Sequence, residues 1–255
     1  MVNVEKKKER VCSYMKKAQK SAELLWVFGI IFVALGVAIC NKADLGVSMI
    51  AAPPFVLYDA VAHLWGGFTV GMLEYLVQGM LLVILCLIIG KFDWRFLLAF
   101  AVAVIYGGML DLFLWLLKDI AVEAVWLRWV LLLVGDVVVG FGVACCFHTY
   151  LPLQVYELFV AEVARRFRIT IPKVKMMFDA SLLVISVVLA FSLFTDAKTF
   201  DWPAIGTTSF HSIGLGTLVT TIINSSIIAL MDKFICRWFD DTPRFSKLEK
   251  VFKHN

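Results

Sequence analysis

The sequence predicts an all-α, polytopic membrane protein: a bundle of about six transmembrane helices in two inverted repeats, with two short interfacial or re-entrant helices. Three observations lead to this prediction. Of the 255 residues, 61% are hydrophobic and only 17% are charged, which is too little polar surface for a soluble domain of this size. Apolar runs long enough to cross a bilayer recur along the chain. Short sequence blocks of the first half also return, in order, in the second half.

Six apolar runs have the length of about 20 residues that a helix needs to cross the hydrocarbon core. The predicted spans are 24–41, 69–90, 96–117, 127–147, 174–194 and 209–235. The eight tryptophans lie at or just beyond the ends of these runs, as expected for side chains that favour the headgroup level. No small-residue cleavage site precedes the first run, so it is interpreted as a span and not as a signal peptide.

Two other segments are predicted to be helical without crossing. Residues 47–64 are apolar but contain Pro53 and Pro54, which are expected to break a helix and free backbone carbonyls. This segment is either a half-helix beside a cavity or a helix on the outer surface. Residues 151–167 are too rich in charged and amide side chains to cross, so they are expected to form an amphipathic helix at the interface or partway into it. If both segments crossed, the chain would have eight spans.

The distribution of basic residues predicts that both termini are cytoplasmic. With six spans, 20 of the 24 Lys and Arg residues lie on the cytoplasmic side, which agrees with the positive-inside rule. Eight spans would give the same division. The basic ends of the chain are expected to lie against anionic lipid of the bilayer and do not indicate a nucleic-acid partner.

An internal duplication is predicted from three blocks that recur in the same order. They are GVAIC at 36–40 with GVACC at 142–146, FTVGMLEYLVQGMLLVI at 68–84 with ITIPKVKMMFDASLLVI at 169–185, and FDW at 92–94 with FDW at 200–202. Three crossings per copy would place the second copy upside down relative to the first, an arrangement common in secondary transporters. Four crossings would make the copies parallel.

The chain is therefore divided into two membrane repeats, a linker and two tails. The predicted parts are a cytoplasmic tail at 1–23, a first repeat at 24–117, an external linker at 118–126, a second repeat at 127–235 and a cytoplasmic tail at 236–255.

Three segments carry a resemblance to a known family: GVAI followed by ADLGVS, the FTVGMLEY entry to the next span, and YGGMLD at 106–111. With them the sequence resembles the YczE/YyaS/YitT-like bacterial integral membrane proteins over most of residues 24–235. The resemblance implies a multi-pass protein of the bacterial cytoplasmic membrane and supplies no substrate. The second half departs from the pattern, because Gly46 aligns with Pro152 and Ser48 with Gln154.

Ionisable side chains within the predicted spans are the first candidates for function, because each costs about 2.5–3.5 kcal/mol to insert. Glu74 and Gln78 lie one turn apart on one face of a helix, and the repeat places Lys175 and Asp179 at the equivalent positions. These pairs either line a polar cavity or, in the case of Glu74, reach water from close to the interface.

Asp111 and Asp136 are the other two intramembrane carboxylates. Asp111 aligns through the repeat with Asn224, so the two are expected to face each other across a pseudo-twofold axis. Asp136 is the deepest, and is either a proton or cation acceptor or the partner of Arg128 or Lys175. Asn224 belongs to a polar helical stripe that forms either part of a cation or polar-solute site or hydrogen bonds between helices. The stripe comprises Thr217, Thr220, Thr221 and Asn224.

These residues lead to the hypothesis of a permease for a small solute or cation that works by alternating access. The predicted path is lined by Glu74, Gln78, Tyr106, Asp111, Asp136, Asp179, Thr217, Thr220, Thr221 and Asn224. The alternative is a membrane protein without transport activity that supports or regulates another membrane or biosynthetic system. No catalytic motif occurs, and the six cysteines and four histidines show no metal-binding spacing, so neither enzyme activity nor a cofactor or metal is expected. The substrate, the coupling ion and the oligomeric state are left open.

Overall fold

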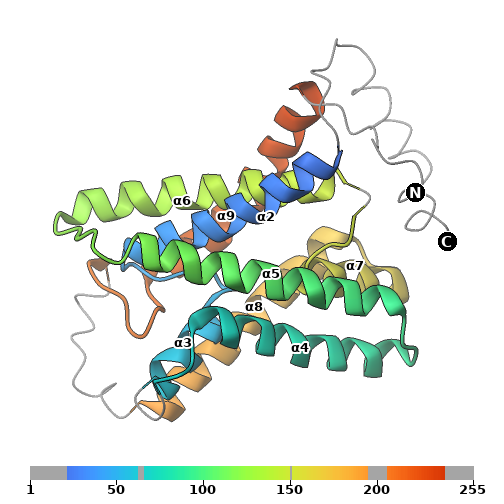
Figure 1. Cartoon of the computed structure of the whole chain (residues 1–255), viewed down its shortest axis with the longest axis horizontal. Helices are drawn as coiled ribbons and strands as arrows, with labels where there is room; N and C mark the ends of the chain where they lie inside the picture. Colours follow the sequence, from blue (N-terminus) through green and yellow to red (C-terminus); the bar gives the residue numbers. More distant parts are fainter. Residues whose placement is uncertain (1–21, 63–65, 150, 195–205, 239–255) are drawn as a thin grey trace.

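The computed structural model describes residues 22–62, 66–149, 151–194 and 206–238, and these parts are all-α (Figure 1). The tails predicted to contact anionic lipid lie almost wholly outside the described residues. The helices are α2 (Ala22–Lys42), α3 (Ala52–Val61), α4 (Val70–Ile89), α5 (Trp94–Leu116), α6 (Val125–Phe147), α7 (Val155–Phe167), α8 (Ile171–Leu193) and α9 (Leu215–Trp238).

Six of these helices, α2, α4, α5, α6, α8 and α9, are long and apolar enough to cross a membrane. The other two are much shorter: α3 has 10 residues and α7 has 13. At 1.5 Å per residue they reach about 15 and 20 Å, less than the roughly 30 Å of a hydrocarbon core. The prediction of six spans and two short helices is confirmed, and the chain is a multi-pass membrane protein.

Two local expectations from the sequence are wrong. The last span was predicted to begin at residue 209, but α9 begins at Leu215 because Phe210 and Ile213 close a tight turn with two backbone hydrogen bonds of 2.7 and 2.9 Å. Pro53 and Pro54 do not break a helix. They lie in the first turn of α3, where a missing backbone N–H leaves no unsatisfied donor and the fixed φ of proline suits the helix.

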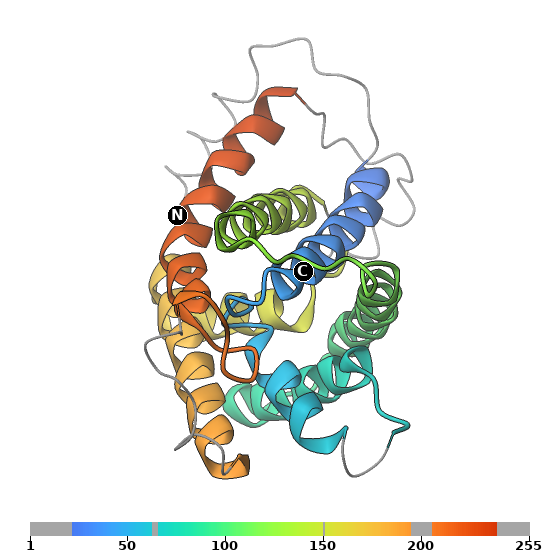
Figure 2. The same ribbon diagram turned by 90° about the vertical axis from the view of Figure 1, so that its left-hand side faces the viewer.

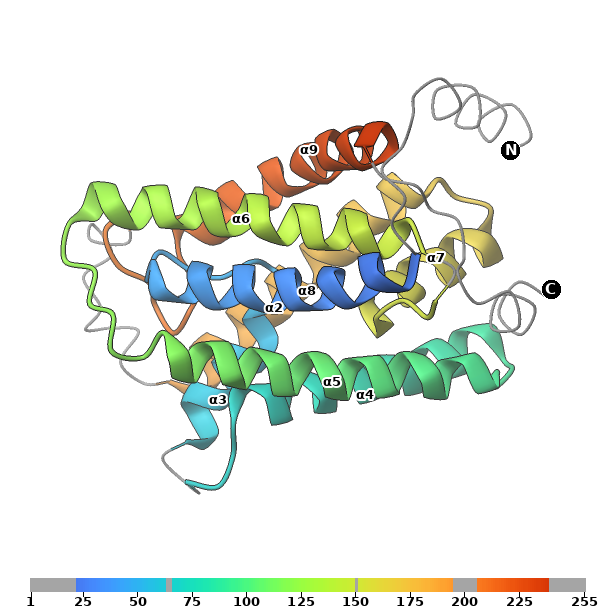
Figure 3. The same cartoon turned by 45° about the horizontal axis from the view of Figure 1, so that its top comes forward.

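α2 and α6 form the central pair and run antiparallel to each other, as Figure 3 shows. Their backbones approach closely where Gly29 faces Gly142 and where Gly36 faces Gly135. A Cβ atom on Gly36 would lie 2.7 Å from the carbonyl oxygen of Gly135, which is closer than a real side chain allows. Glycine at these positions is therefore required for the contact.

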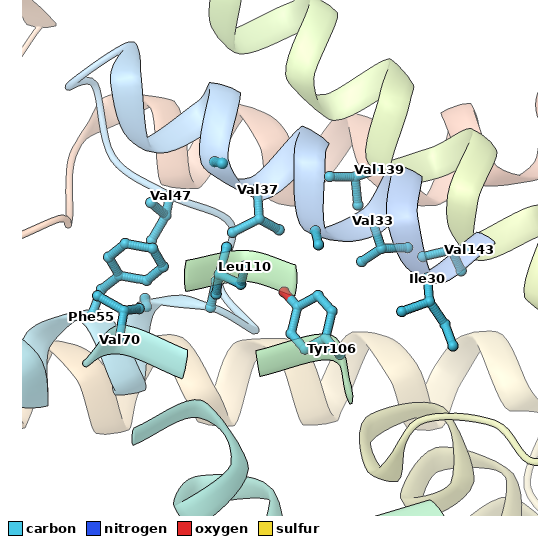
Figure 4. Packing of buried hydrophobic residues seen from close by; sticks show 14 of the residues in the cluster. Ile30, Val33, Val37, Val47, Phe55, Val70, Tyr106, Leu110, Val139 and Val143 are labelled. Carbon is cyan, nitrogen blue, oxygen red and sulfur yellow. The ribbon is translucent and has the colours of Figure 1, made fainter. Parts of the chain in front are cut away.

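The largest apolar cluster surrounds this pair and extends towards α5. Figure 4 shows its side chains lying between α2, α5, α6 and the chain before α3. They include Ile30, Val33, Val37, Val47, Phe55, Tyr106, Leu110, Val139 and Val143. α2 is consequently packed on several sides. Half of its apolar stretch is buried inside the protein, whereas only 11% of the apolar stretch of α9 is buried.

The remaining helices surround the central pair. α5 packs on α2 and on α4, α9 packs on α6, α3 packs on α4 and α8, and α7 packs on α4, α5 and α8. Figure 2 shows α8 and α9 along one edge of the molecule, α5 on the opposite edge, and α2 and α6 between them. The outer faces carry exposed apolar side chains such as Leu87 (77%) and Ile222 (76%), as expected for surfaces that contact the lipid bilayer.

The ADLG segment after α2, residues 43–46, packs closely against the start of α9. Asp44 accepts hydrogen bonds from Arg128 and Ser209, at 3.2 and 2.7 Å. Gly46 has a φ of +105°, and a Cβ atom there would collide with the hydroxyl of Thr217. These contacts hold the segment after α2 against the start of α9. They also engage Arg128, which the sequence suggested as a partner of Asp136.

The two glycines of YGGMLD provide a matched test of helix contact. A Cβ atom on Gly107 would lie 2.7 Å from the carbonyl oxygen of Gly71 on α4, whereas one on Gly108 would meet nothing within 4 Å. We expect Gly107→Ala to destabilise the protein by about 1–3 kcal/mol, a typical cost of overpacking. Gly108→Ala should be neutral or stabilising by up to about 1 kcal/mol, because alanine favours the helix. Thermal unfolding of both variants in detergent measures the difference, and equal melting temperatures would contradict the α4–α5 contact.

Candidate functional site

A cavity of about 30 Å³ lies where α2, α5, α6, α8 and α9 meet the chain before α3 and the start of α7. Its volume is enough for about two water molecules. Four valines of α2 and α6, together with Ile50, Ala51 and Ile228, form its apolar walls. Its polar lining comprises Ser48, Tyr106, Gln154, Tyr156, Glu157, Lys175 and Asn224.

A buried acid–amide pair on α4 lies beside this cavity. Glu74 and Gln78 are fully buried, and the Gln78 side-chain amide donates a 3.2 Å hydrogen bond to the Glu74 carboxylate. The Gln78 carbonyl oxygen accepts from the backbone N–H of Val155 at 3.3 Å, so it satisfies a donor that the first turn of α7 leaves without a helical partner. Tyr156, which lines the cavity, places its hydroxyl beside the Glu74 carboxyl.

A second pair of charged residues lies on the α8 side of the cavity. The Lys175 ammonium is 3.5 Å from the Asp179 carboxylate one turn later. Lys175 and the neighbouring Glu157 both line the cavity and interact electrostatically. α7 therefore directs Tyr156 to the pair on α4 and Glu157 to the pair on α8.

Within this cluster, acidic groups outnumber basic ones. Glu74, Glu157 and Asp179 supply three carboxyl groups, and Lys175 supplies one ammonium group. Four buried polar atoms of the cluster have no hydrogen-bond partner among the described residues: Gln154 Nε2, Glu157 Oε2, Asp179 Oδ1 and Asn224 Oδ1. Buried polar atoms are nearly always satisfied, so this nitrogen and these three oxygens are expected to bond to water.

Glu157 is the member of this cluster that lies outside the spanning helices, on α7. Burial raises the pKa of its carboxyl above the usual range, because a charged group loses its hydration there. Lys175 lowers the pKa and Asp179 raises it. The protonation state of Glu157 therefore depends on the charges around it.

The structure brings five of the predicted path residues to this region. Tyr106 and Asn224 line the cavity, and Figure 4 shows the Tyr106 hydroxyl directed towards α2. Glu74, Gln78 and Asp179 belong to the adjoining polar network.

The other predicted residues lie elsewhere. Asp111 accepts a 2.8 Å hydrogen bond from the backbone N–H of Gly71 in the first turn of α4, a donor that the helix leaves without an internal partner, and it does not line the cavity that Asn224 lines. Asp136 is buried near Cys40, and Lys175, one of its suggested partners, is paired with Asp179. The threonine hydroxyls serve α9 itself: Thr217 Oγ1 accepts from the Gly214 N–H, while Thr220 and Thr221 donate to the Thr217 carbonyl.

Five polar cavity residues were not among the predicted path residues: Ser48, Gln154, Tyr156, Glu157 and Lys175. A signal existed for Lys175, which aligns with Glu74 in the predicted repeat. Gln154, Tyr156 and Glu157 lie at 151–167, whose charge indicated an amphipathic helix at the interface. α7 is indeed amphipathic, but its buried face, which includes Val155, Tyr156 and Val160, packs into the bundle.

Comparison with protein families places the chain in a family whose function is unknown. The family of unknown function DUF6198 matches residues 20–233. The chain belongs to this family. The matched range contains every helix described above except the last residues of α9, and so includes the whole polar cluster of this DUF6198 member. No curated protein and no solved structure matches the chain. The resemblance to YczE/YyaS/YitT-like proteins stays a prediction.

The raised pKa of Glu157 predicts how the stability of this DUF6198 member depends on pH. Below the ordinary glutamate pKa of about 4.3, the carboxyl is protonated in the folded and unfolded states and its burial involves no charge. As the pH rises from this value through the higher pKa of the folded state, the unfolded protein releases the proton more readily than the folded protein. The free energy of unfolding therefore falls over this range. Glu157→Gln should therefore show a smaller fall in melting temperature between pH 5 and pH 8 than the parent protein.

Lys175→Met provides the complementary variant for this pH test. It removes the cation that lowers the Glu157 pKa, so the fall in melting temperature between pH 5 and pH 8 should become larger than in the parent. Identical pH profiles for the parent and both variants would show that Glu157 is not buried in the folded protein.

Proposed function

We propose that this protein is a transporter that carries a small cation, or a small cationic solute, through the central cavity by alternating access. The observation that carries the proposal is a cavity lined by Glu157 and Lys175, with two further carboxyl groups, those of Glu74 and Asp179, in the polar network beside it. Placing uncompensated carboxylates inside a membrane is costly, and such groups usually mark ion or proton pathways. Oxygen atoms without partners are the ligands that hard cations require.

The size of the cavity favours a small occupant. A volume of about 30 Å³ accommodates one or two atoms the size of a water oxygen, which suits a dehydrated monovalent ion or the head of a small cation. Ser48, Gln154 and Asn224 offer neutral oxygens, and Glu157 offers a carboxylate beside Lys175. A cation that enters would compete with Lys175 for Glu157, which is a simple way to couple binding to a rearrangement of α7 against α8.

The inverted internal repeat that the sequence predicts supports this mechanism. When residues are paired at the repeat offset of 106, Gly29 corresponds to Gly135 and Gly36 to Gly142. The contact of Gly29 with Gly142 then exchanges with the contact of Gly36 with Gly135. A Cβ atom would lie 2.5 Å from Cys146 Sγ at Gly29 and 2.6 Å from Cys40 Sγ at Gly135, and these cysteines also correspond. Such reciprocity is what a twofold axis between two copies produces.

The cavity lining follows the same pairing. Ser48, Ile50 and Ala51 correspond to Gln154, Tyr156 and Glu157 at the offset of 106, and all six line the cavity. The four wall valines also form two corresponding pairs, Val33 with Val139 and Val37 with Val143. A site on a pseudo-twofold axis that relates antiparallel halves is the arrangement from which inverted-repeat carriers open to either side.

The second half departs from the first where the site needs its polar groups. Ile50 and Ala51 are replaced by Tyr156 and Glu157, and Glu74 and Gln78 by Lys175 and Asp179. α4 packs on α5, whereas α8 makes no comparable contact with α9 among the described residues. The second half therefore provides Glu157, Lys175 and the more loosely packed helices, and we assign the larger movement during transport to α8 and α9.

The charge distribution supports an orientation with both termini in the cytoplasm, and the family resemblance supports a bacterial cytoplasmic membrane. In this orientation α7 lies on the cytoplasmic side and α3 on the opposite side. Basic tail segments outside the described residues would contact anionic lipid.

Flux in proteoliposomes tests the proposal. Purified protein would be reconstituted, and uptake of radioactive sodium, rubidium and guanidinium would be measured separately under an inward gradient, with a trapped pH dye to report protons. At least one probe should enter faster than in protein-free vesicles. Glu157→Gln should reduce this rate at least about tenfold, which corresponds to a loss of about 1.4 kcal/mol.

Glu162→Gln is the matched control, because Glu162 lies on the same helix but pairs with the exposed Arg165 outside the cavity. It should keep the parent flux. If no probe enters, or if Glu157→Gln transports as well as the parent, the cavity is not a transport site, and the role of a supporting or regulatory membrane protein is favoured.

A further inference from the structure

A second group of polar side chains lies at the far end of the α6–α9 contact, away from the central cavity. His148 caps the C-terminal end of α6. Asp232 and Cys236 lie four residues apart in α9, so both project from the same face of that helix. The three residues offer a nitrogen, an oxygen and a sulfur atom that all lie within 4.8 Å of one another.

The geometry converges on one atom, His148 Nε2. It is 2.9 Å from Asp232 Oδ1 and 3.6 Å from Cys236 Sγ. In tetrahedral zinc sites, bonds of about 2.0–2.2 Å to nitrogen and oxygen and about 2.3 Å to sulfur place the ligand atoms roughly 3.3–3.6 Å apart. The nitrogen–sulfur distance already fits, and the nitrogen–oxygen distance needs to open by about half an ångström. The oxygen and sulfur atoms lie within 4.8 Å of each other, so a rotation of the Asp232 or Cys236 side chain brings them to the remaining tetrahedral separation.

We propose that His148, Asp232 and Cys236 form a binding site for a zinc-like divalent transition metal ion. Imidazole and thiolate together select borderline-soft ions over Mg²⁺ and Ca²⁺, which prefer oxygen ligands. The His148 side chain is 7% exposed and that of Asp232 is 32% exposed, so the site is held by the protein on one side and reaches solvent on the other. A water molecule completes the fourth position.

Binding releases protons from the site. The Cys236 thiol loses its proton to solvent as the metal–sulfur bond forms, and His148 binds through Nε2 with its remaining proton on Nδ1. The metal replaces the 2.9 Å hydrogen bond between His148 and Asp232 and joins the end of α6 to α9. This site does not rest on the proposed transport function.

A simple structural link would not need these three residue types. At the end of α2, the corresponding helix of the first half, Lys42 donates a 2.8 Å hydrogen bond to the carbonyl of Lys118 after α5. One cation and one carbonyl are sufficient there to tie two helix ends together. The 2.9 Å hydrogen bond between His148 and Asp232 would be sufficient to do the same for α6 and α9, and it does not require the Cys236 thiol 3.6 Å from the same nitrogen.

The sequence did not reveal this site, and the expectation of no metal followed from local spacing alone. His148 and Asp232 are 84 residues apart, whereas recognisable metal motifs place at least two ligands within a few residues and repeat the pattern. The pair at 232 and 236 has helical spacing that also occurs in ordinary amphipathic helices.

Cobalt substitution tests the site. The full-length protein, purified in detergent with a tag free of histidine and cysteine, would be stripped with a chelator and titrated with Co²⁺ and then Zn²⁺. We expect one Co²⁺ per chain, with the near-ultraviolet thiolate-to-cobalt band and the strong visible bands of tetrahedral Co²⁺. Both should disappear when Zn²⁺ is added. Absence of these bands in the parent protein would overturn the proposal.

Variants locate the signal. Cys236→Ser should lose the thiolate band, whereas Cys86→Ser, which alters a partly buried cysteine on α4, should keep it with unchanged stoichiometry. Asp232→Asn should keep the thiolate band but weaken Co²⁺ binding and shift the visible bands, so it remains informative if Cys236→Ser does not fold. A thiolate band that survives in Cys236→Ser, or an Asp232→Asn spectrum identical to the parent, would show that the metal binds elsewhere.

Discussion

The rest of the structure depends on the close antiparallel contact between α2 and α6. Gly29, Gly36, Gly135 and Gly142 allow the two backbones to approach to a distance that any side chain would prevent. Because the helices run in opposite directions, the chain leaves them at opposite ends of the pair. The segment that follows each helix nevertheless turns back into the bundle. Residues 48–51 after α2 and residues 154–157 after α6 therefore meet at the same cavity. The central contact therefore defines both the axis of the fold and the position of the site.

Turning the chain back into an apolar bundle creates a problem of unsatisfied backbone donors, and the two halves solve it differently. At α3, Pro53 and Pro54 remove N–H groups from the buried first turn. At α7, the side chain of Gln78 accepts the N–H of Val155, and this interaction brings Glu74 next to Tyr156. Around the cavity, Tyr156 and Glu157 of the second half stand where the first half has the apolar residues Ile50 and Ala51.

Most of the fold was predictable from the sequence, because hydrophobic length determines the spans and basic residues avoid the apolar runs. The i, i+4 pairing of Glu74 with Gln78, and of Lys175 with Asp179, was also predictable, since it depends only on helical periodicity. The role of Asp111 was not: an intramembrane carboxylate can serve a pathway or cap a neighbouring helix, and only the position of the Gly71 N–H decides between them. Glu157 was missed because charge within a short helix indicates the interface whenever tertiary contacts are unknown. His148, Asp232 and Cys236 were missed because their proximity arises from packing between α6 and α9.

The central claim is that one cavity on the axis between α2 and α6 opens in turn to each face of the membrane. The most direct measurement is the reactivity of single cysteines, Ser48→Cys and Gln154→Cys, in a background without the six native cysteines. Sealed vesicles would be exposed to a membrane-impermeant thiol reagent, first from outside and then from inside. The account predicts that each cysteine reacts from both faces, because the two residues line the same cavity. Reaction of Ser48→Cys from one face only and of Gln154→Cys from the other only would show two separate surface sites and would contradict alternating access.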